Sequence, residues 1–92
     1  LVLCRDCLVH LAYADIFKAL ANLKASGSKY FLTTTYTDMA RNHDTPTGSH
    51  RALGLHLPPF NFPQPLHLID EQCPDPGYED KALGLWRMVD LP

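Results

Sequence analysis

The sequence predicts an α/β domain, because a strand, an amphipathic helix and a second strand follow one another between Leu1 and Tyr36. A strand–helix–strand unit of this length forms two parallel strands joined by a right-handed crossover. Two further strand-like segments, Leu66–Asp70 and Lys81–Val89, are separated by turn residues, which is typical of an antiparallel hairpin with a long connection. The predicted order is therefore strand, helix, strand, long loop, strand, strand in one mixed sheet.

The first strand and the helix are predicted from local patterns. Leu1–Cys4 is apolar, which favours a buried strand, and the charged pair Arg5–Asp6 interrupts the apolar run. Apolar residues then recur at helical spacing from about Leu8 to Leu23. We expect Gly27 to end this helix in the left-handed conformation.

The second strand, Lys29–Tyr36, is rich in aromatic and β-branched residues. Because the first two strands are apolar over most of their length, we expect both faces of the sheet to be covered. On the last strand we expect alternate residues on opposite faces. The pair on one face is Trp86 and Met88, and the pair on the other is Leu85 and Val89.

The segment 37–65 is predicted to be a long loop lying on the surface of the domain. It holds five of the eight prolines and two of the five glycines. Loops of this length within a compact domain are usually functional or disordered.

The composition indicates one folded domain and argues against two classes of partner. The chain has 92 residues, of which 46% are hydrophobic and 20% charged. Eight Lys and Arg form no cluster and are outnumbered by ten Asp and Glu, which argues against nucleic-acid binding. No apolar run approaches the ~20 residues of a membrane span, and no signal peptide is visible. We therefore expect a cytoplasmic location, with the odd set of three cysteines reduced.

Four stretches of the sequence carry a resemblance to the class I S-adenosylmethionine-dependent methyltransferases. "LVLCRDCLVHL" resembles the fourth strand and the start of the following helix, and "NLKASGSKYFLTTTY" resembles the end of that helix and the fifth strand. "PLHLIDE" and "KALGLWRM" resemble the sixth and seventh strands, which form an antiparallel hairpin. The resemblance implies the C-terminal part of a Rossmann-like, seven-stranded sheet.

The resemblance also implies what the chain does. Residues 1–92 are interpreted as a single partial domain that catalyses methyl transfer to an unidentified acceptor when joined to the missing N-terminal half. The family's glycine-rich cofactor turn and its ribose-binding acidic residue would both precede Leu1. We therefore expect the chain alone to be inactive. The alternative is a non-catalytic interaction module that assembles through its exposed first strand.

The expected cofactor contacts follow the first strand. Ligands of open α/β sheets bind outside the carboxyl ends of the parallel strands. By resemblance, Cys4, Arg5 and Asp6 lie beside the methionine part of S-adenosylmethionine, partly through backbone groups. The alternative is that Arg5 and Asp6 form a solvated turn.

One candidate catalytic residue and six candidate acceptor contacts complete the predicted site. Histidine is the side chain suited to proton transfer near neutral pH, so His10 is a candidate general base, although a histidine in an apolar stretch is often a packing residue. The long loop is expected to lie over the acceptor pocket, or else to be a proline-rich segment packed on the sheet. Its polar and aromatic candidates, with the end of the second strand, are Tyr36, Asn42, Asp44, Arg51, Phe60 and Asn61.

A zinc site is also considered. Cys4, Cys7 and His10 form C-x2-C-x2-H, and Cys73 would be a fourth ligand. We expect the sulfurs of Cys4 and Cys7 to point apart, because one residue lies on the strand and the other on the turn. No metal is therefore predicted. The other histidines are expected to face solvent.

Overall fold

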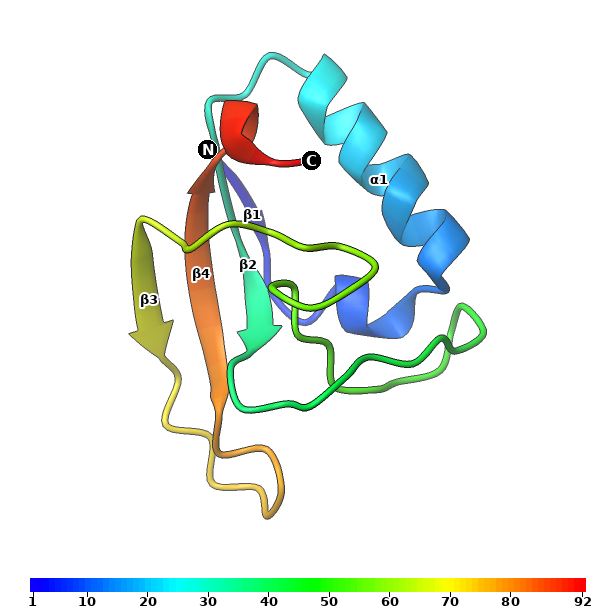
Figure 1. Ribbon diagram of the computed structural model, residues 1–92, viewed down its shortest axis with the longest axis vertical. Coiled ribbons are helices and arrows are strands. Elements are labelled where there is room, and N and C mark those ends of the chain that lie inside the picture. The colour runs from blue at the N-terminus through cyan, green and yellow to red at the C-terminus, as the bar shows by residue number, and fades with distance from the viewer.

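The computed structural model describes residues 1–92 and contains one α-helix and one four-stranded sheet (Figure 1). The strands are β1 (Val2–Cys4), β2 (Tyr30–Tyr36), β3 (His67–Asp70) and β4 (Lys81–Arg87). The helices are α1 (Tyr13–Ala25) and two 3-10 turns, η1 (Leu8–His10) and η2 (Met88–Asp90). The predicted order of elements is confirmed.

The sheet is mixed, with the strand order β1-β2-β4-β3. β1 pairs with β2 in parallel, and β4 is antiparallel to both β2 and β3. The predicted parallel pair and the predicted antiparallel hairpin are both present. Because β4 alone runs in the opposite direction, β1, β2 and β3 all end where β4 begins. We call this end the carboxyl end of the sheet.

The helix begins later than the apolar spacing predicts. Leu8–His10 forms η1, and Leu11 and Ala12 are extended before α1 begins at Tyr13. The carbonyls of Leu8 and Leu11 accept hydrogen bonds from the Arg51 side chain, so the loop competes with the helix for them. The end of the helix is as predicted, since Gly27 follows with φ of 79°.

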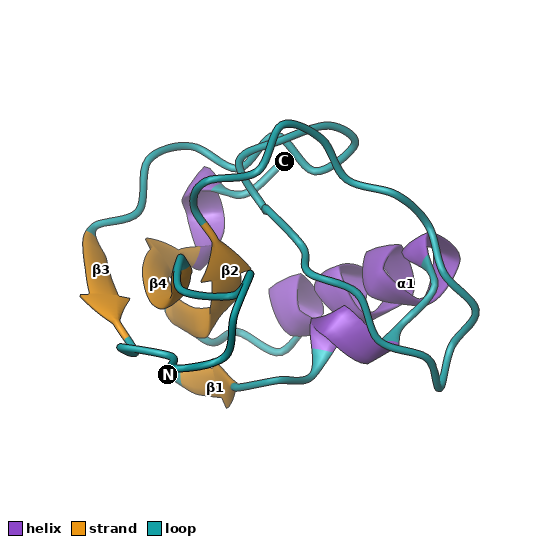
Figure 2. Cartoon of the chain, turned by 90° about the horizontal axis from the view of Figure 1, so that it is seen from below, coloured by secondary structure: helices purple, strands orange, loops and turns teal.

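One face of the sheet carries the core. Ile16 and Leu20 of α1 are buried in a cluster with Phe31 of β2 and Trp86 of β4. The long loop adds buried side chains to the same cluster, and Figure 2 shows it running from β2 toward α1 and back to β3. Gly84 lies beneath the Trp86 ring, where a Cβ atom would be 2.5 Å from the indole carbons. A side chain at that position would push the ring out of the core.

The opposite face of the sheet has no helix over it and is buried only near its carboxyl end, at Thr34 and Tyr36, so the expectation of two covered faces is wrong. Leu3, Leu32 and Leu85 lie in register across three strands on this face. Leu3 is 60% exposed, and Ile69 on β3 is 51% exposed. The expectation that the first strand is buried is wrong for the same reason, because no helix packs on this side.

The last strand is shorter than predicted. β4 ends at Arg87, and the backbone N–H of Met88 donates to the carbonyl of Lys29 at the start of η2. Met88 stays buried, whereas Val89 is 86% exposed. The expected pairing of Val89 with Leu85 on one strand face is therefore wrong.

The chain is compact. Its radius of gyration is 12.4 Å, and a folded domain of this length is expected at about 12 Å. No helix combines the length and the apolar character needed to cross a bilayer.

Phe31→Ala is expected to lower the free energy of unfolding by about 3–5 kcal/mol, because it empties a fully buried aromatic site in the core. Phe17→Ala is the matched control, since Phe17 is 46% exposed and contacts mainly the Phe60 ring. We expect a loss of about 1 kcal/mol for this control. Urea unfolding measures both values, and equal losses would contradict the described core.

Candidate functional site at the carboxyl end of the sheet

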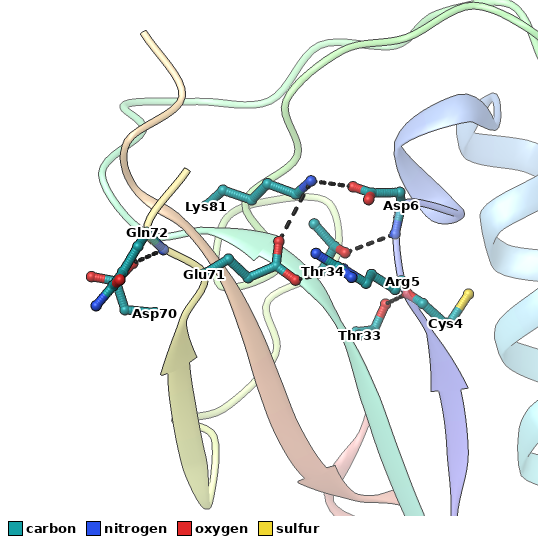
Figure 3. A network of polar contacts seen from close by, with 9 residues as sticks. All are labelled: Cys4, Arg5, Asp6, Thr33, Thr34, Asp70, Glu71, Gln72 and Lys81. Atoms are coloured by element: carbon teal, nitrogen blue, oxygen red, sulfur yellow. Dashed lines mark hydrogen bonds and ion pairs between the residues drawn. The ribbon is translucent and has the colours of Figure 1, made fainter. Parts of the chain in front are cut away.

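Charged residues from three strands meet at the carboxyl end of the sheet. Arg5 and Asp6 follow β1, Glu71 follows β3, and Lys81 is the first residue of β4. Figure 3 shows these four side chains converging, with the hydroxyls of the β2 threonines beside them. The strand order produces this meeting, because it brings three strand ends and one strand start to the same place.

The four charges form an alternating chain of ion pairs. Lys81 Nζ lies 2.5 Å from Asp6 Oδ1 and 3.5 Å from Glu71 Oε2, and Arg5 Nε donates to Glu71 Oε1 at 2.8 Å. The inner pair is sheltered, since the Glu71 and Lys81 side chains are 7% and 15% exposed. The two side chains at the ends of this row are open to solvent: Arg5 is 60% exposed and Asp6 is 43% exposed. One cation and one carboxylate therefore face solvent at this end.

The backbone is unusual where it presents these charges. Asp6 has φ of 54°, and its N–H donates to Thr34 Oγ1 at 2.8 Å. Gln72, beside Glu71, has φ of 52°, and its N–H donates to Asp70 Oδ1 at 2.7 Å. Left-handed backbone costs a residue other than glycine about 1–2 kcal/mol, and it concentrates at functional positions. The Asp6 N–H therefore points toward β2, and the Gln72 N–H closes a local turn with Asp70.

The pKa values of two side chains at this end of the sheet, Lys81 and Tyr36, are raised. The hydrogen bond to Asp6, with the charges of Asp6 and Glu71, raises the pKa of Lys81 above its usual value, against an opposing effect of burial. Burial chiefly raises the pKa of the Tyr36 hydroxyl, which lies near Lys81 and Asp6. Near neutral pH, Lys81 therefore stays charged and Tyr36 stays protonated.

A row of rings links His10 to the same end of the sheet. The His10 ring is centred 5.3 Å from His50, His50 lies 5.9 Å from Tyr78, and Tyr78 lies 5.8 Å from Tyr36. The rings of His50 and Tyr78 thus lie between His10 and Tyr36. His10 and the other four histidines are exposed, as expected for the latter.

Three of the predicted acceptor contacts instead hold the long loop in place. Asn42 donates to the carbonyls of Gly54 and Pro58 and accepts from the Gly54 N–H. Asp44 Oδ1 accepts from the N–H of Tyr13, at the first turn of α1. These side chains make the hydrogen bonds that a loop without secondary structure otherwise lacks.

Of these three side chains, Arg51 makes the most hydrogen bonds. It is 4% exposed, and its guanidinium donates to four backbone carbonyls. Those carbonyls belong to Leu8, Val9, Leu11 and His43. Its guanidinium carbon also lies 5.5 Å from the centre of the Tyr13 ring. The side chain therefore fastens the loop to the segment before α1 and has little capacity left for a ligand.

The other two predicted contacts also lie away from the carboxyl end. Phe60 is 2% exposed, and its ring lies 5.3 Å from the rings of both Tyr13 and Phe17. Asn61 is exposed in a left-handed conformation, with φ of 50°. The aromatic part of the loop therefore packs on α1, and it leaves Tyr36 as the predicted acceptor contact beside the ion pairs.

Sequence reasoning missed Glu71, Lys81 and Tyr78. A signal for the first two was present, because Glu71 directly follows one predicted strand and Lys81 begins the next. In an antiparallel pair those two positions lie side by side. Placing them beside Asp6 also needs the strand order, which local patterns do not give. No local signal points to Tyr78, which lies in the turn-rich connection.

The cysteines differ from the prediction in one respect. Cys7 raises the pKa of Cys4, so the two thiols interact, whereas the sequence predicts that their sulfurs point apart. No group of three or more His, Cys, Asp or Glu is placed to hold a metal ion.

A hollow of about 540 Å³ lies at the other end of the sheet. It is bordered by the turn after α1, the first residue of β2 and the last residue of β4. None of the predicted site residues lines it. The candidate site therefore rests on the charged groups at the carboxyl end, which form an open surface.

Comparison of the chain with protein-family models, with curated proteins and with solved structures gave no match. Its likeness to the methyltransferases therefore remains the resemblance carried by the four stretches quoted above.

Arg51→Lys is expected to lower the free energy of unfolding by about 3 kcal/mol, because an ammonium group cannot donate to four spread carbonyls and leaves those of Leu11 and His43 without their donor. Arg41→Lys is the control, since Arg41 is exposed on the same loop, and we expect a change within about 0.5 kcal/mol. Urea unfolding of the two variants measures both changes in the free energy of unfolding. Similar small losses would show that Arg51 does not fasten the loop.

Stability is expected to fall as the pH rises above about 10, in part through Lys81. Its pKa is raised above 10.5 by folding, so its contribution is complete below that value and is lost as the pH climbs through the folded value. Lys81→Met should flatten this alkaline decline, whereas Lys29→Met, at an exposed position, should not. Urea unfolding between about pH 8 and about pH 11 measures the three slopes. Parallel slopes for the wild type and Lys81→Met would refute the role of the ion pairs.

Proposed function

We propose that this chain is part of a class I S-adenosylmethionine-dependent methyltransferase domain and that the carboxyl end of its sheet forms one wall of the cofactor site. The observation that carries the proposal is the meeting of three strand ends at one place, with exposed charges of both signs. Open α/β sheets bind their ligands at this end. The parallel β1–α1–β2 unit, followed by an antiparallel pair, supports the same reading through its likeness to the family.

The exposed charges suit the methionine part of the cofactor, which carries an ammonium group and a carboxylate. The open carboxylate of Asp6 matches the ammonium group, and the open guanidinium of Arg5 matches the carboxylate. Lys81 and Glu71 lie behind them and hold both in position. In this proposal Cys4 contributes through its place at the end of β1, directly before these two residues.

His10 is the candidate general base for the acceptor. Its Nδ1 lies 3.0 Å from the carbonyl oxygen of Ser49, which only accepts hydrogen bonds, so Nδ1 carries the proton. Nε2 is then free to take a proton from an acceptor oxygen or nitrogen. Bound S-adenosylmethionine would supply an activated methyl group, and catalysis would depend mainly on aligning the acceptor with it. The row of rings from His10 to Tyr36 lies along the path that an acceptor would take.

The uncovered face of the sheet and the free edge of β1 are the surfaces at which the rest of such a domain would join. A free strand edge carries unpaired N–H and C=O groups that accept a further strand. The apolar row through Leu3, Leu32 and Leu85 offers a face for helices to cover. The chain alone is expected to bind the cofactor weakly, and a cytoplasmic location with reduced cysteines belongs to the same proposal.

A second candidate function rests on the same edge. Leu1 is 74% exposed and Leu3 is 60% exposed beside the unpaired side of β1. An interaction module that adds a strand from a partner at β1 would use these residues. The two functions differ in which residues respond to the cofactor and in whether the chain self-associates.

Titration of the 15N-labelled chain with S-adenosylhomocysteine tests the proposal. We expect amide shifts at residues 4–6 and 34–36, with a dissociation constant of about 1 mM or weaker. Asp6→Asn should reduce these shifts, because it removes the carboxylate that meets the ammonium group. Asp38→Asn is the matched control, since Asp38 is an exposed carboxylate of the loop.

Two results would contradict the methyltransferase proposal. One is the absence of shifts at these amides at millimolar ligand, and the other is an unchanged pattern in Asp6→Asn. If the β1 amides instead shift with protein concentration while the apparent mass doubles, the interaction module is supported.

A further inference from the structure

Cys4 and Cys7 stand at the two ends of a tight turn. Cys4 is the last residue of β1, Arg5 and Asp6 form the turn, and Cys7 directly precedes η1. The Cα atoms at the ends of such a turn lie within about 7 Å of each other, and a disulfide needs about 4.4–6.8 Å. The left-handed Asp6 reverses the chain so that the second cysteine returns toward the first.

The surroundings of the two sulfurs differ in a useful way. Cys7 is exposed, and Cys4 is partly buried against the sheet, close to the Thr33 hydroxyl and the Leu8 N–H. Cys73, the third cysteine, lies in the loop after β3, where its thiol contacts Asp75. The accessible thiol of Cys7 thus follows the more sheltered thiol of Cys4 by three residues. Cys73 lies in a different loop and is not part of this pair.

We propose that Cys4 and Cys7 form a reversible disulfide, which makes the turn carrying Arg5 and Asp6 a thiol–disulfide redox site. The oxidant it would take is a low-molecular-weight disulfide such as oxidised glutathione. A C-x-x-C pair after a strand of a β–α–β unit is typical of dithiol redox sites. This inference does not depend on the proposed methyltransferase function.

The exchange takes place in two steps. The thiolate of exposed Cys7 attacks one sulfur of oxidised glutathione, and the glutathione S–S bond breaks to release one glutathione thiolate. Cys4 then loses its proton to solvent and attacks the Cys7 sulfur, which releases the second glutathione thiolate. Two protein thiols are oxidised to one disulfide, and one glutathione disulfide is reduced to two thiols.

The second step is helped by the first. Burial, a hydrogen bond with Cys7 and the negative charge of Cys7 raise the pKa of Cys4 to about 12. The two effects of Cys7 disappear once its sulfur is held in a mixed disulfide. The Leu8 N–H, which favours the thiolate, remains. Cys4 is therefore a poor nucleophile in the reduced protein and a better one when a disulfide is presented to it.

Oxidation of Cys4 and Cys7 would also affect the ion pair between Asp6 and Lys81. The turn that closes into a ring holds Asp6, whose N–H donates to Thr34 and whose carboxylate pairs with Lys81. A ring through Cys4 and Cys7 fixes the backbone on both sides of Asp6. The redox state of the pair thus bears directly on how the carboxyl end presents its open carboxylate.

The test uses the Cys73→Ser variant, treated with oxidised glutathione, quenched in acid and measured by intact mass after alkylation. We expect a monomer that has lost two hydrogen atoms, carries no alkyl group and is restored by dithiothreitol. Peptide mapping should place the bond between Cys4 and Cys7. A monomer that keeps one glutathione on Cys7 indefinitely, or a disulfide-linked dimer as the main product, would overturn the proposal.

Two double variants separate the roles of the thiols. Cys4→Ser with Cys73→Ser should stop at a glutathione adduct on Cys7, and Cys7→Ser with Cys73→Ser should react at least tenfold more slowly. Circular dichroism checks that each variant is folded. Equal rates in the two double variants would contradict the assignment of Cys7 as the attacking thiol, and the result for Cys73→Ser stands without either of them.

Discussion

The antiparallel ladder between β2 and β4 is the constraint on which the rest of the structure depends. It pairs seven consecutive residues of each strand, from Tyr30 with Arg87 to Tyr36 with Lys81. Because β4 also pairs with β3, the ladder makes β3 parallel to β1 and β2. Lys81 is thereby placed beside Tyr36 and within reach of the two strand ends that carry Asp6 and Glu71. Without this ladder the four charges would have no common location.

The long loop is part of the core although it has no regular secondary structure. Its buried leucines and phenylalanines supply apolar contacts, and its backbone needs hydrogen-bond partners. Asn42 and Arg51 provide four of those partners within the loop, and three further bonds from Arg51 fasten the loop to the segment before α1. The loop can then pack Phe60 on α1 and Phe62 against Trp86. Its polar residues are used for folding, and the open charges of the molecule lie at the carboxyl end of the sheet.

The strands and the helix were predictable because their signals are local: alternation, helical spacing, and glycine after the helix. The location of Arg5, Asp6 and Tyr36 at the carboxyl end of the sheet was predictable, since each stands at or just after a strand end. Arg51 was placed wrongly by sequence reasoning because its bonds reach more than 40 residues back along the chain. No local pattern encodes such a contact. Glu71 and Lys81 were missed because their meeting with Asp6 depends on the strand order, which is a property of the whole sheet.

The most direct test of this account is the position of β4, measured by cross-strand nuclear Overhauser effects in the 15N- and 13C-labelled chain. Gly84 is opposite Thr33 on one side and Leu68 on the other. The account predicts contacts from Gly84 to both residues and none between Thr33 and Leu68. Direct contacts between Thr33 and Leu68 would place β3 beside β2. The carboxyl ends, the ion pairs and the candidate site would then not meet as described.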